Sequence, residues 1–437
     1  MPELSSVMPA RKARNAGGRT NLLHDTWYRR TRRAVVETIH ATDDIVSRLG
    51  RAQVRVLFEA ASPMSLTVFR PLLEHLYRDE RLQLWFTTSD ESWDDDRIFR
   101  AAGITERIVT PAAARWMKFD AYVNADFWNT TWLPRRTKRI HMFHGVAGKY
   151  GLDAPVSIAP VVASFDRLMF PNRDRLLRYA EAGLIDLDGP EAALVGYPKV
   201  DCLVDGSLDR EAIQQSLGLD PGLPTVLYAP TWSPYSSLHS IGTEVMFGLG
   251  RLGVNVIVKL HDRSYDQGDR ASGGVDWRAR LERVSRGQHL HVAQDADASP
   301  YLFAADLLVT DHSSVGFEFM LLDRPIVAID CPVLIEKARV AADKVRLLQS
   351  AAAVVTDADG VVKAVGQELG DRDRLSGERR AIAAELFFCP GGATTRALKS
   401  LYDLLALPAL DALTATDSPA PIIPAFSRYE ARTSTRA

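Results

Sequence analysis

The chain has 437 residues, of which 46% are hydrophobic and 25% charged, a composition typical of a globular protein with room for two domains. Its formal net charge of −2 excludes a strongly basic balance, and we expect no nucleic acid among its partners. The three cysteines are widely spaced, which argues against a disulfide framework and a zinc site, and no apolar run approaches the roughly 20 residues that cross a bilayer. With no secretory signal pattern either, we expect a cytoplasmic protein.

The first 50 residues predict a basic extension and helix that precede the first domain. Residues 1–20 combine Pro, Ser and Gly with basic side chains, a composition typical of disorder. A helical period follows over residues 27–49, with Arg29, Arg30, Arg32 and Arg33 at its start. Two interpretations stay open: a solvated helix that packs on the first domain, or a basic amphipathic segment that attaches the protein to the anionic inner face of the cell membrane.

Residues 51–221 alternate strand and helix patterns, which predicts an N-terminal Rossmann-like domain with a parallel sheet covered by helices. We expect strands at residues 54–58, 82–87, 107–109, 121–123, 139–143, 167–170 and 192–195, and helices at 64–77, near 98–99 and at 172–182. The acidic run at residues 94–96 indicates a solvated helix start rather than a metal site, because acids stabilise the first turn of a helix.

The strand expected at residues 139–143 leads into a loop that begins with His144 and contains Gly145, Gly148, Lys149 and Gly151. Glycines allow the backbone to approach a ligand closely, and loops at the carboxyl ends of strands carry the chemistry of doubly wound sheets. His144 is therefore a candidate functional residue. The competing interpretation is a histidine with a structural role.

A stretch rich in Pro, Gly and Asp at residues 218–224 marks the expected domain boundary. The alternation then resumes, and residues 222–407 predict a second, C-terminal Rossmann-like domain. Its expected strands are residues 225–228, 255–260, 288–292, 307–310, 326–329 and 352–355, with helices at 244–252, 315–322 and from 360 onwards. Residues 408–437 lack periodicity and predict a disordered tail.

Residues 306–330 have the layout of a nucleotide site, with a strand, a polar turn, a buried helix and a second strand. The turn carries Asp311, His312, Ser313 and Ser314, and a helix that starts there offers N–H donors and a partial positive charge to a pyrophosphate. Glu318 lies one turn further on. Because a carboxylate repels phosphate, Glu318 is better suited to accept hydrogen bonds from ribose hydroxyls. An ordinary capped βαβ crossover would have the same pattern.

Several short motifs follow one another in a characteristic order. They are Phe143-His144-Gly145 with Gly148 and Lys149, Gly196-Tyr197-Pro198-Lys199-Val200-Asp201, Tyr228-Ala229-Pro230-Thr231-Trp232, Lys259-Leu260-His261 and Thr310-Asp311-His312-Ser313-Ser314. In this order and spacing they resemble the motifs of the CDP-glycerol glycerophosphotransferase family, which builds teichoic-acid-like polyol phosphate polymers of the cell envelope. The chain departs from the family pattern at Val146-Ala147, which replace Thr-Pro, at Asp262, which replaces Pro, and at His312, which replaces Tyr.

The resemblance implies an α/β fold of the glycosyltransferase-B (GT-B) type, in which two Rossmann-like, doubly wound domains face a cleft, with no metal and no cofactor. It implies transfer of a glycerol phosphate or related polyol phosphate from a CDP-activated donor to a hydroxyl of a polyanionic or lipid-linked glycan or polymer acceptor, with release of CMP. His144 would take the proton of the acceptor hydroxyl, within a loop that includes Gly145, Gly148 and Lys149. His261 would be the second catalytic residue and, with Lys259, would neutralise charge near the leaving phosphate. The donor would be held by Ser313 and Ser314 at the pyrophosphate, by Glu318 at the ribose, and by Thr231, Lys259 and Asp311.

Two other classes of function fit the same motifs. The first is a GT-B glycosyltransferase or a sugar-nucleotide epimerase that uses a UDP-sugar, because the motifs at residues 259–261 and 311–314 suit any nucleoside diphosphate. The second is a catalytically degenerate assembly protein that binds nucleotide without turnover, which the departures at residues 146–147 and 262 would favour.

Overall fold

The computed structural model describes residues 53–88, 95–126, 132–134, 136–147, 159–269, 271–286, 290–338 and 340–408, together with Thr31, Ala34, Val35 and Thr38. The chain divides into two compact units, Met1–Ala52 and Gln53–Ala437. The arginines of the N-terminal segment, the tail after residue 408, Gly148 and Lys149 lie outside the described residues. In the described part of the chain, no helix combines the length and apolar character needed to span a bilayer.

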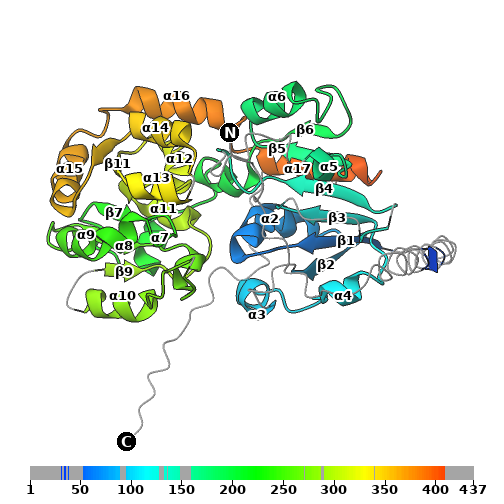
Figure 1. Ribbon diagram of the computed structural model, residues 1–437, viewed down its shortest axis with the longest axis horizontal. Helices are drawn as coiled ribbons and strands as arrows, with labels where there is room; N and C mark the ends of the chain where they lie inside the picture. The colour runs from blue at the N-terminus through cyan, green and yellow to red at the C-terminus, as the bar shows by residue number, and fades with distance from the viewer. Residues whose placement is uncertain are drawn as a thin grey trace, which may run out of the picture. The chain divides into compact units, whose positions relative to one another are not determined.

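The first sheet of the larger unit is parallel and has the strand order β2-β1-β3-β4-β5-β6 (Figure 1). Its strands are β1 (Val54–Glu59), β2 (Leu82–Thr87), β3 (Ala121–Asn124), β4 (Lys138–Met142), β5 (Arg167–Phe170) and β6 (Ala192–Leu194). The helices between them are α2 (Pro63–Leu76), α3 (Asp95–Ile98), η1 (Arg100–Ala102), α4 (Pro111–Ala114), α5 (Ala159–Val162) and α6 (Arg173–Glu181), and η3 (Pro198–Leu203) follows. We call this sheet and these helices the first lobe.

The second sheet is also parallel, with the order β12-β11-β10-β7-β8-β9. Its strands are β7 (Thr225–Tyr228), β8 (Asn255–Val258), β9 (Leu290–Val292), β10 (Leu307–Thr310), β11 (Ile326–Ile329) and β12 (Ala353–Val355). The helices of this second lobe are α7 (Arg210–Ser216), α8 (Ser237–Ser240), α9 (Gly242–Leu249), η4 (Asp262–Tyr265), α10 (Trp277–Ser285), α11 (Ser299–Ala304), α12 (Val315–Met320), α13 (Pro332–Ala338), α14 (Ala342–Ser350), α15 (Ala358–Gly370) and α16 (Ser376–Leu386). The chain order reverses between β7 and β10, which makes the carboxyl ends of these two strands the place where a doubly wound sheet binds its ligand.

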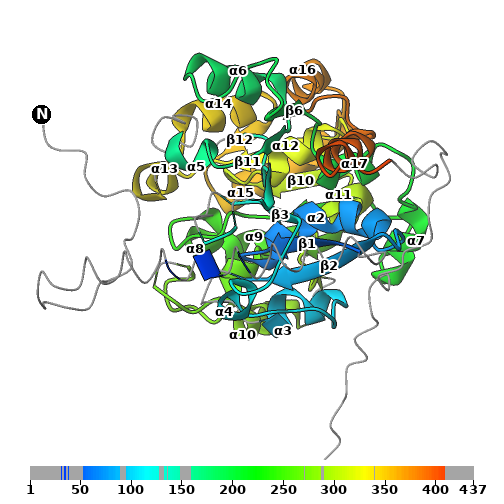
Figure 2. The ribbon, with the colours of Figure 1, turned by 90° about the vertical axis from the view of Figure 1, so that its right-hand side faces the viewer.

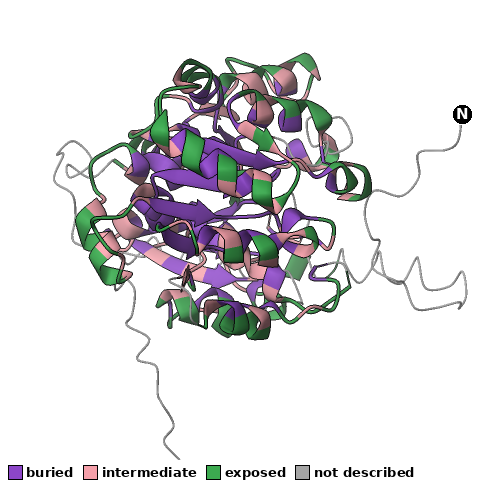
Figure 3. Cartoon of the chain, turned by 90° about the vertical axis from the view of Figure 1, so that its left-hand side faces the viewer, coloured by how far each residue is buried: buried purple, intermediate pink, exposed green. Residues whose placement is uncertain are grey.

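The central strands of the second sheet are buried along their whole length, and Figure 3 shows them between helices whose outer faces are exposed. A parallel strand covered on both faces needs apolar residues at successive positions, not at alternate ones. The run Leu307-Leu308-Val309 in β10 meets this requirement, with each residue 0% exposed. The continuous apolar runs of the sequence therefore form the central strands of the second sheet.

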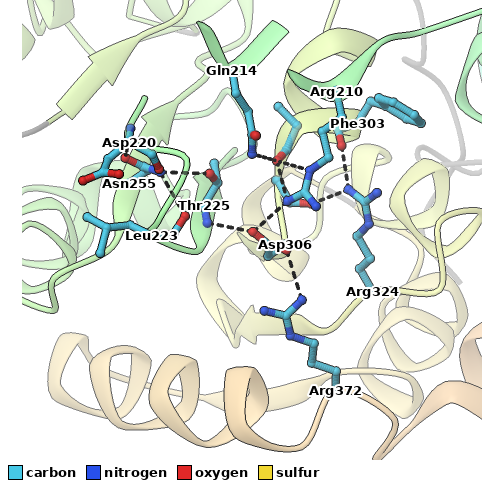
Figure 4. Close-up of polar contacts among 12 residues, drawn as sticks. Arg210, Gln214, Asp220, Leu223, Thr225, Asn255, Phe303, Asp306, Arg324 and Arg372 are labelled. Atoms are coloured by element: carbon cyan, nitrogen blue, oxygen red, sulfur yellow. Dashed lines mark hydrogen bonds and ion pairs between the residues drawn. The ribbon is translucent and has the colours of Figure 1, made fainter. Parts of the chain in front are cut away.

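The amino-terminal edge of the second sheet is held together by side chains around Asp306, just before β10 (Figure 4). The Asp306 carboxylate accepts a hydrogen bond from the backbone N–H of Thr225 (2.9 Å) and pairs with Arg210 (2.7 Å) and Arg372 (3.1 Å). Nearby, the guanidinium of Arg324 donates to the carbonyl oxygens of residues 303 and 305. These contacts tie β7, β10, α7 and the segment after α15 together at this edge.

The last helix, α17 (Ala393–Leu404), returns to the first lobe, where it packs against α2 and η3 (Figure 2). The Tyr402 hydroxyl donates to Asp79 (2.9 Å), and Arg167 donates to the Ser400 hydroxyl (2.7 Å). This arrangement differs from the expectation that residues 222–407 pack together as one domain, because the end of that range completes the first lobe instead. The strand expected at residues 107–109 is also reduced to a single bridge between Ile108 and Phe86.

Candidate functional site

His144 follows β4 at the carboxyl edge of the first sheet, and its side chain is 47% exposed. Its Nδ1 lies 2.8 Å from the carbonyl oxygen of Ala125 and 3.3 Å from Oδ1 of Asp126. The other oxygen of Asp126 accepts a hydrogen bond from the Ser65 hydroxyl (3.1 Å). Because two acceptors face Nδ1, the neutral form of the ring carries its proton on Nδ1 and the lone pair that a general base needs on Nε2.

A row of buried polar side chains lies beneath this histidine. The Tyr122 hydroxyl donates to Glu59, Asn124 donates to the Tyr122 hydroxyl (3.1 Å), and Asn124 Oδ1 faces Nδ1 of His141 (2.9 Å). Burial, with a smaller contribution from His144, holds the pKa of His141 well below its usual value. The row joins the carboxyl ends of β1, β3 and β4 with neutral imidazole at one end, and so it fixes the strand ends from which His144 projects.

Thr231 and Asp311 meet where β7 and β10 end. Oδ1 of Asp311 accepts hydrogen bonds from the backbone N–H groups of Thr231 (2.9 Å) and His312 (2.6 Å), and Oδ2 accepts from the backbone and hydroxyl of Ser237 (3.1 and 2.9 Å). Asp311 is 0% exposed, which differs from the direct donor contact expected of it: its carboxylate positions the loops of the site. In contrast, the buried Thr231 hydroxyl has no hydrogen-bond partner among the described residues.

Lys259 and His261 follow β8 at the same edge. The Lys259 ammonium donates to the Leu260 carbonyl oxygen (2.7 Å), and burial lowers its pKa, against the opposing effect of Asp262 and Asp297. Nδ1 of His261 accepts a hydrogen bond from the backbone N–H of Arg263 (3.1 Å). A neutral His261 therefore carries its proton on Nε2, where it can donate to a phosphate oxygen.

Ser314 begins helix α12, where it is exposed and its side chain makes no capping hydrogen bond, and Ser313 is half-buried. Glu318, in the same helix, is 4% exposed and bound by the Lys199 ammonium, which lies 2.8 and 2.7 Å from its two oxygens. No role was expected for Lys199 from its sequence motif, and the cation partner of Glu318 was not expected either.

The two lobes line shared cavities at their carboxyl edges. A small cavity of about 20 Å³ brings Ala147, three residues after His144, next to Ser314 at the start of α12. A larger cavity of about 320 Å³ is bordered by Pro63 and Leu66 of the first lobe and by Asp262 of the second lobe. The first pair flanks Ser65, which holds Asp126 beside His144, and Asp262 directly follows His261. The segments that carry His144 and His261 therefore reach these two cavities, although neither histidine is among the residues that line them.

The structure thus gathers the expected donor residues Thr231, Lys259, His261, Ser313 and Ser314 at the carboxyl edge of the second sheet, and His144 and Gly145 lie at the carboxyl edge of the first sheet. Ser65 and Asp126 were not predicted from the sequence. Asp126 could have been found, since it lies three residues after the end of the strand expected at residues 121–123. Among the described residues, no group of three or more His, Cys, Asp or Glu side chains is arranged to hold a metal ion.

Comparison with known proteins places this site in a family. Residues 106–331, about half of the chain, match the sequence model of the family described as CDP-Glycerol:Poly(glycerophosphate) glycerophosphotransferase. The chain belongs to this family. It is therefore a transferase that moves glycerol phosphate from CDP-glycerol to a polymer acceptor, as expected from its motifs. A comparison with curated proteins gave no match.

Solved structures confirm the GT-B architecture. The wall teichoic acid polymerase TagF aligns at 16% identity and a TM-score of 0.59, over 86% of this chain and 97% of its own. S. aureus MnaA with UDP aligns at 12% identity and a TM-score of 0.51, over 84% of this chain and 99% of its own. The UDP-GlcNAc 2-epimerase from Neisseria meningitidis aligns at 11% identity and a TM-score of 0.52, over 80% of this chain and 100% of its own. At these identities the likeness is one of fold, and the epimerases lend no support to a UDP-sugar reaction here.

Proposed function

We propose that the transferase joins a hydroxyl of its acceptor to the glycerol-bearing phosphorus of CDP-glycerol, with His144 as the general base and the second lobe as the donor site. The observation that carries this proposal is the anchoring of His144 Nδ1 by the Ala125 carbonyl and Asp126, at 2.8 and 3.3 Å. In its neutral form, an imidazole held in this way presents the lone pair of Nε2 to a hydroxyl in the space between the lobes.

The reaction exchanges one bond at phosphorus for another. The acceptor oxygen bonds to the phosphorus that carries glycerol, and its proton passes to Nε2 of His144. The bond from this phosphorus to the bridging oxygen breaks, and the bridging oxygen leaves with CMP. Because the attacking and leaving oxygens lie on opposite sides of the phosphorus, catalysis depends on groups positioned on both lobes.

The second lobe stabilises the charge that develops on the leaving CMP. Nε2–H of His261 and the buried Lys259 ammonium face this charge from the end of β8, and the Thr231 hydroxyl donates to a phosphate oxygen. Ser313 and Ser314 hold the pyrophosphate. This arrangement is supported by the Thr231 hydroxyl, which is buried without a partner among the described residues and is satisfied once a phosphate binds.

The acceptor in this proposal is a polyanionic or lipid-linked glycan or polymer, and Gly145 and Lys149 belong to the loop that meets it. The basic segment at residues 27–49 attaches the enzyme peripherally to the anionic inner face of the membrane, where a lipid-linked acceptor resides. Deletion of residues 1–33 should move the enzyme from the membrane pellet to the supernatant. An unchanged distribution would exclude this role for the segment.

The reaction is tested by the nucleotide that it releases. The enzyme is incubated with an acceptor and, separately, with CDP-glycerol, CDP-ribitol and UDP-sugars, and the products are separated by chromatography. Phosphopolyol transfer releases CMP, whereas sugar transfer releases a nucleoside diphosphate. Release of CMP from a CDP-polyol supports the proposal. Release of UDP from a UDP-sugar, or binding of CDP-glycerol without turnover, would contradict it.

A further inference from the structure

The segment Tyr197-Pro198-Lys199 has no part in the proposed reaction, although it contacts both lobes of the site. Lys199 pairs with Glu318 through both carboxylate oxygens, and the two side chains are 2% and 5% exposed. Two residues earlier, the Tyr197 hydroxyl donates to the backbone carbonyl oxygen of His144 (3.1 Å). One short segment thus connects the backbone of the proposed base to the carboxylate expected at the donor ribose.

The segment is itself held firmly in place. Asp201, at the end of the same motif, accepts hydrogen bonds from the backbone N–H groups of Gly391 (2.8 Å), Ala393 (3.1 Å) and Thr394 (2.6 Å) at the start of α17. Val200 beside it is 0% exposed. Because the backbone of this segment is anchored, the Lys199 ammonium is confined to a small region, and this restricts where the Glu318 carboxylate can lie.

The Lys199–Glu318 pair leaves hydrogen-bonding capacity on the carboxylate unused. Burial works to lower the pKa of Lys199, but the Glu318 carboxylate outweighs it and holds the pKa above the usual value, so the ammonium stays charged. A carboxylate has about four lone-pair directions, and one ammonium occupies one on each oxygen. The remaining directions can accept two hydrogen bonds from adjacent hydroxyls, such as the 2′ and 3′ hydroxyls of a ribose.

Stability alone does not account for a charged pair at this place. The desolvation of two buried charges offsets most of their attraction, and an apolar pair of similar volume often stabilises a fold as well. The pair does provide a carboxylate that is desolvated, held in one orientation and kept next to a cation. Such a carboxylate is a strong acceptor for hydroxyl groups.

We propose that Lys199 is a positioning residue for donor recognition, which holds Glu318 in the orientation that accepts the ribose hydroxyls of CDP-glycerol. This inference rests on the proposed function and on the ribose contact that the sequence predicts for Glu318. Lys199 acts through Glu318 and does not touch the reacting atoms. Its loss therefore weakens donor binding and the preference for ribose over deoxyribose, with a smaller effect on the transfer step.

The test compares CDP-glycerol with its 2′-deoxy analogue in the full-length enzyme. The wild type should prefer the ribose donor by about tenfold or more in kcat/KM, as expected for a hydroxyl bound to a carboxylate. Lys199→Met should remove most of this preference, mainly through a higher KM for CDP-glycerol. Lys199→Arg should lose part of it, because a guanidinium is larger and shifts the carboxylate.

Two further variants separate the possible explanations. Tyr197→Phe removes the bond to the His144 carbonyl, and it should lower kcat while the preference for ribose stays intact. Glu318→Gln tests the ribose contact itself. If Glu318→Gln abolishes the preference but Lys199→Met and Lys199→Arg keep it at the wild-type level, the inference about Lys199 is wrong and the ribose contact stands. If Glu318→Gln keeps the preference, the ribose contact is wrong as well.

The inference about Lys199 can still be tested if the Lys199→Met variant fails to fold. The loss of the lysine leaves a buried carboxylate unpaired, so thermal unfolding is measured for every variant. Lys199→Arg keeps the charge, and calorimetric binding of CDP and 2′-deoxy-CDP to this variant then decides the outcome. A folded Lys199→Arg enzyme with a reduced preference for CDP supports the inference, and one with the full wild-type preference overturns it.

Discussion

An aspartate at each end of β10 binds the neighbouring strand β7 in the same way, but the two ends differ in whether the polar groups around the aspartate all have partners. Asp306 precedes the strand and accepts the N–H of Thr225 at the start of β7, and Asp311 follows the strand and accepts the N–H of Thr231 just beyond the end of β7. At the amino end, Arg210 and Arg372 complete the contacts of the carboxylate. At the carboxyl end, the neighbouring Thr231 hydroxyl is buried without a partner in the described part of the chain. The same aspartate-to-backbone contact therefore occurs at an amino edge where the arginines complete the hydrogen bonding, and at a carboxyl edge where a hydroxyl is left to bind a ligand.

If this contrast is correct, substitutions at the carboxyl edges should reduce activity and leave stability nearly unchanged. We expect the largest effect for His144→Ala, which removes the proposed base and should lower kcat by roughly 100-fold to 10,000-fold. Calorimetric binding of CDP should stay near the wild-type affinity, because the donor residues lie on the second lobe. Turnover close to that of the wild type would exclude the role assigned to His144.

Thr231→Val sharpens the comparison, since activity and stability should change in opposite directions. Valine has nearly the shape of threonine but no hydroxyl, so kcat/KM for CDP-glycerol should fall by about tenfold through the loss of one hydrogen bond to phosphate. A buried hydroxyl without a partner destabilises the free enzyme, and the melting temperature should therefore stay the same or rise. A lower melting temperature with unchanged kcat/KM would mean that the hydroxyl has a structural role only.

Asp306→Asn at the amino edge should lower stability and leave activity unchanged, and its effect should be the smallest of the three. The neutral side chain weakens the contacts with Arg210 and Arg372, and because both arginines are partly exposed, we expect a loss of about 1–2 kcal/mol in the free energy of unfolding. The kinetic constants for CDP-glycerol should not change. Urea unfolding and steady-state kinetics on the same preparation measure both quantities, and a change in KM would show that the two edges are coupled.

The pH dependence of the free energy of unfolding provides an internal control for Asp306→Asn. Burial acts to raise the pKa of Asp306, but the Thr225 N–H and the two arginines outweigh it and hold the pKa below its usual value. Its stabilising contribution is therefore fully present above the unfolded pKa of about 3.9 and disappears as the pH falls through the folded pKa. The difference in unfolding free energy between the wild type and Asp306→Asn should shrink below about pH 4.

The strands could be predicted well because burial on both faces leaves a simple pattern. The apolar runs at residues 225–228, 307–310 and 326–329 coincide with β7, β10 and β11. The destination of α17 could not be predicted in the same way. An amphipathic helix shows that one face is buried, but its sequence does not say which part of the chain covers that face.

The positions of the candidate site residues in the fold could be predicted as far as local motifs allowed. The chain order of His144, Thr231, Lys259, His261 and the serines placed each at the carboxyl end of a strand, where the structure has them. The contacts that orient these residues join distant positions: Ser65 to Asp126 across 61 residues, and Lys199 to Glu318 across 119. Neither periodicity nor motif spacing carries information about such pairs, so the orienting residues became visible only in three dimensions.

The return of α17 to the first lobe links the assembly of the enzyme to the order of its synthesis. The Asp201 carboxylate and the Asp79 carboxylate receive their partners from residues 391–402, which leave the ribosome after the entire second sheet. The packing of the first lobe is therefore complete only after α17 has been synthesised. A nascent chain that stops short of α17 leaves the Asp79 and Asp201 carboxylates without these partners, and the first lobe lacks the helix that packs against α2 and η3.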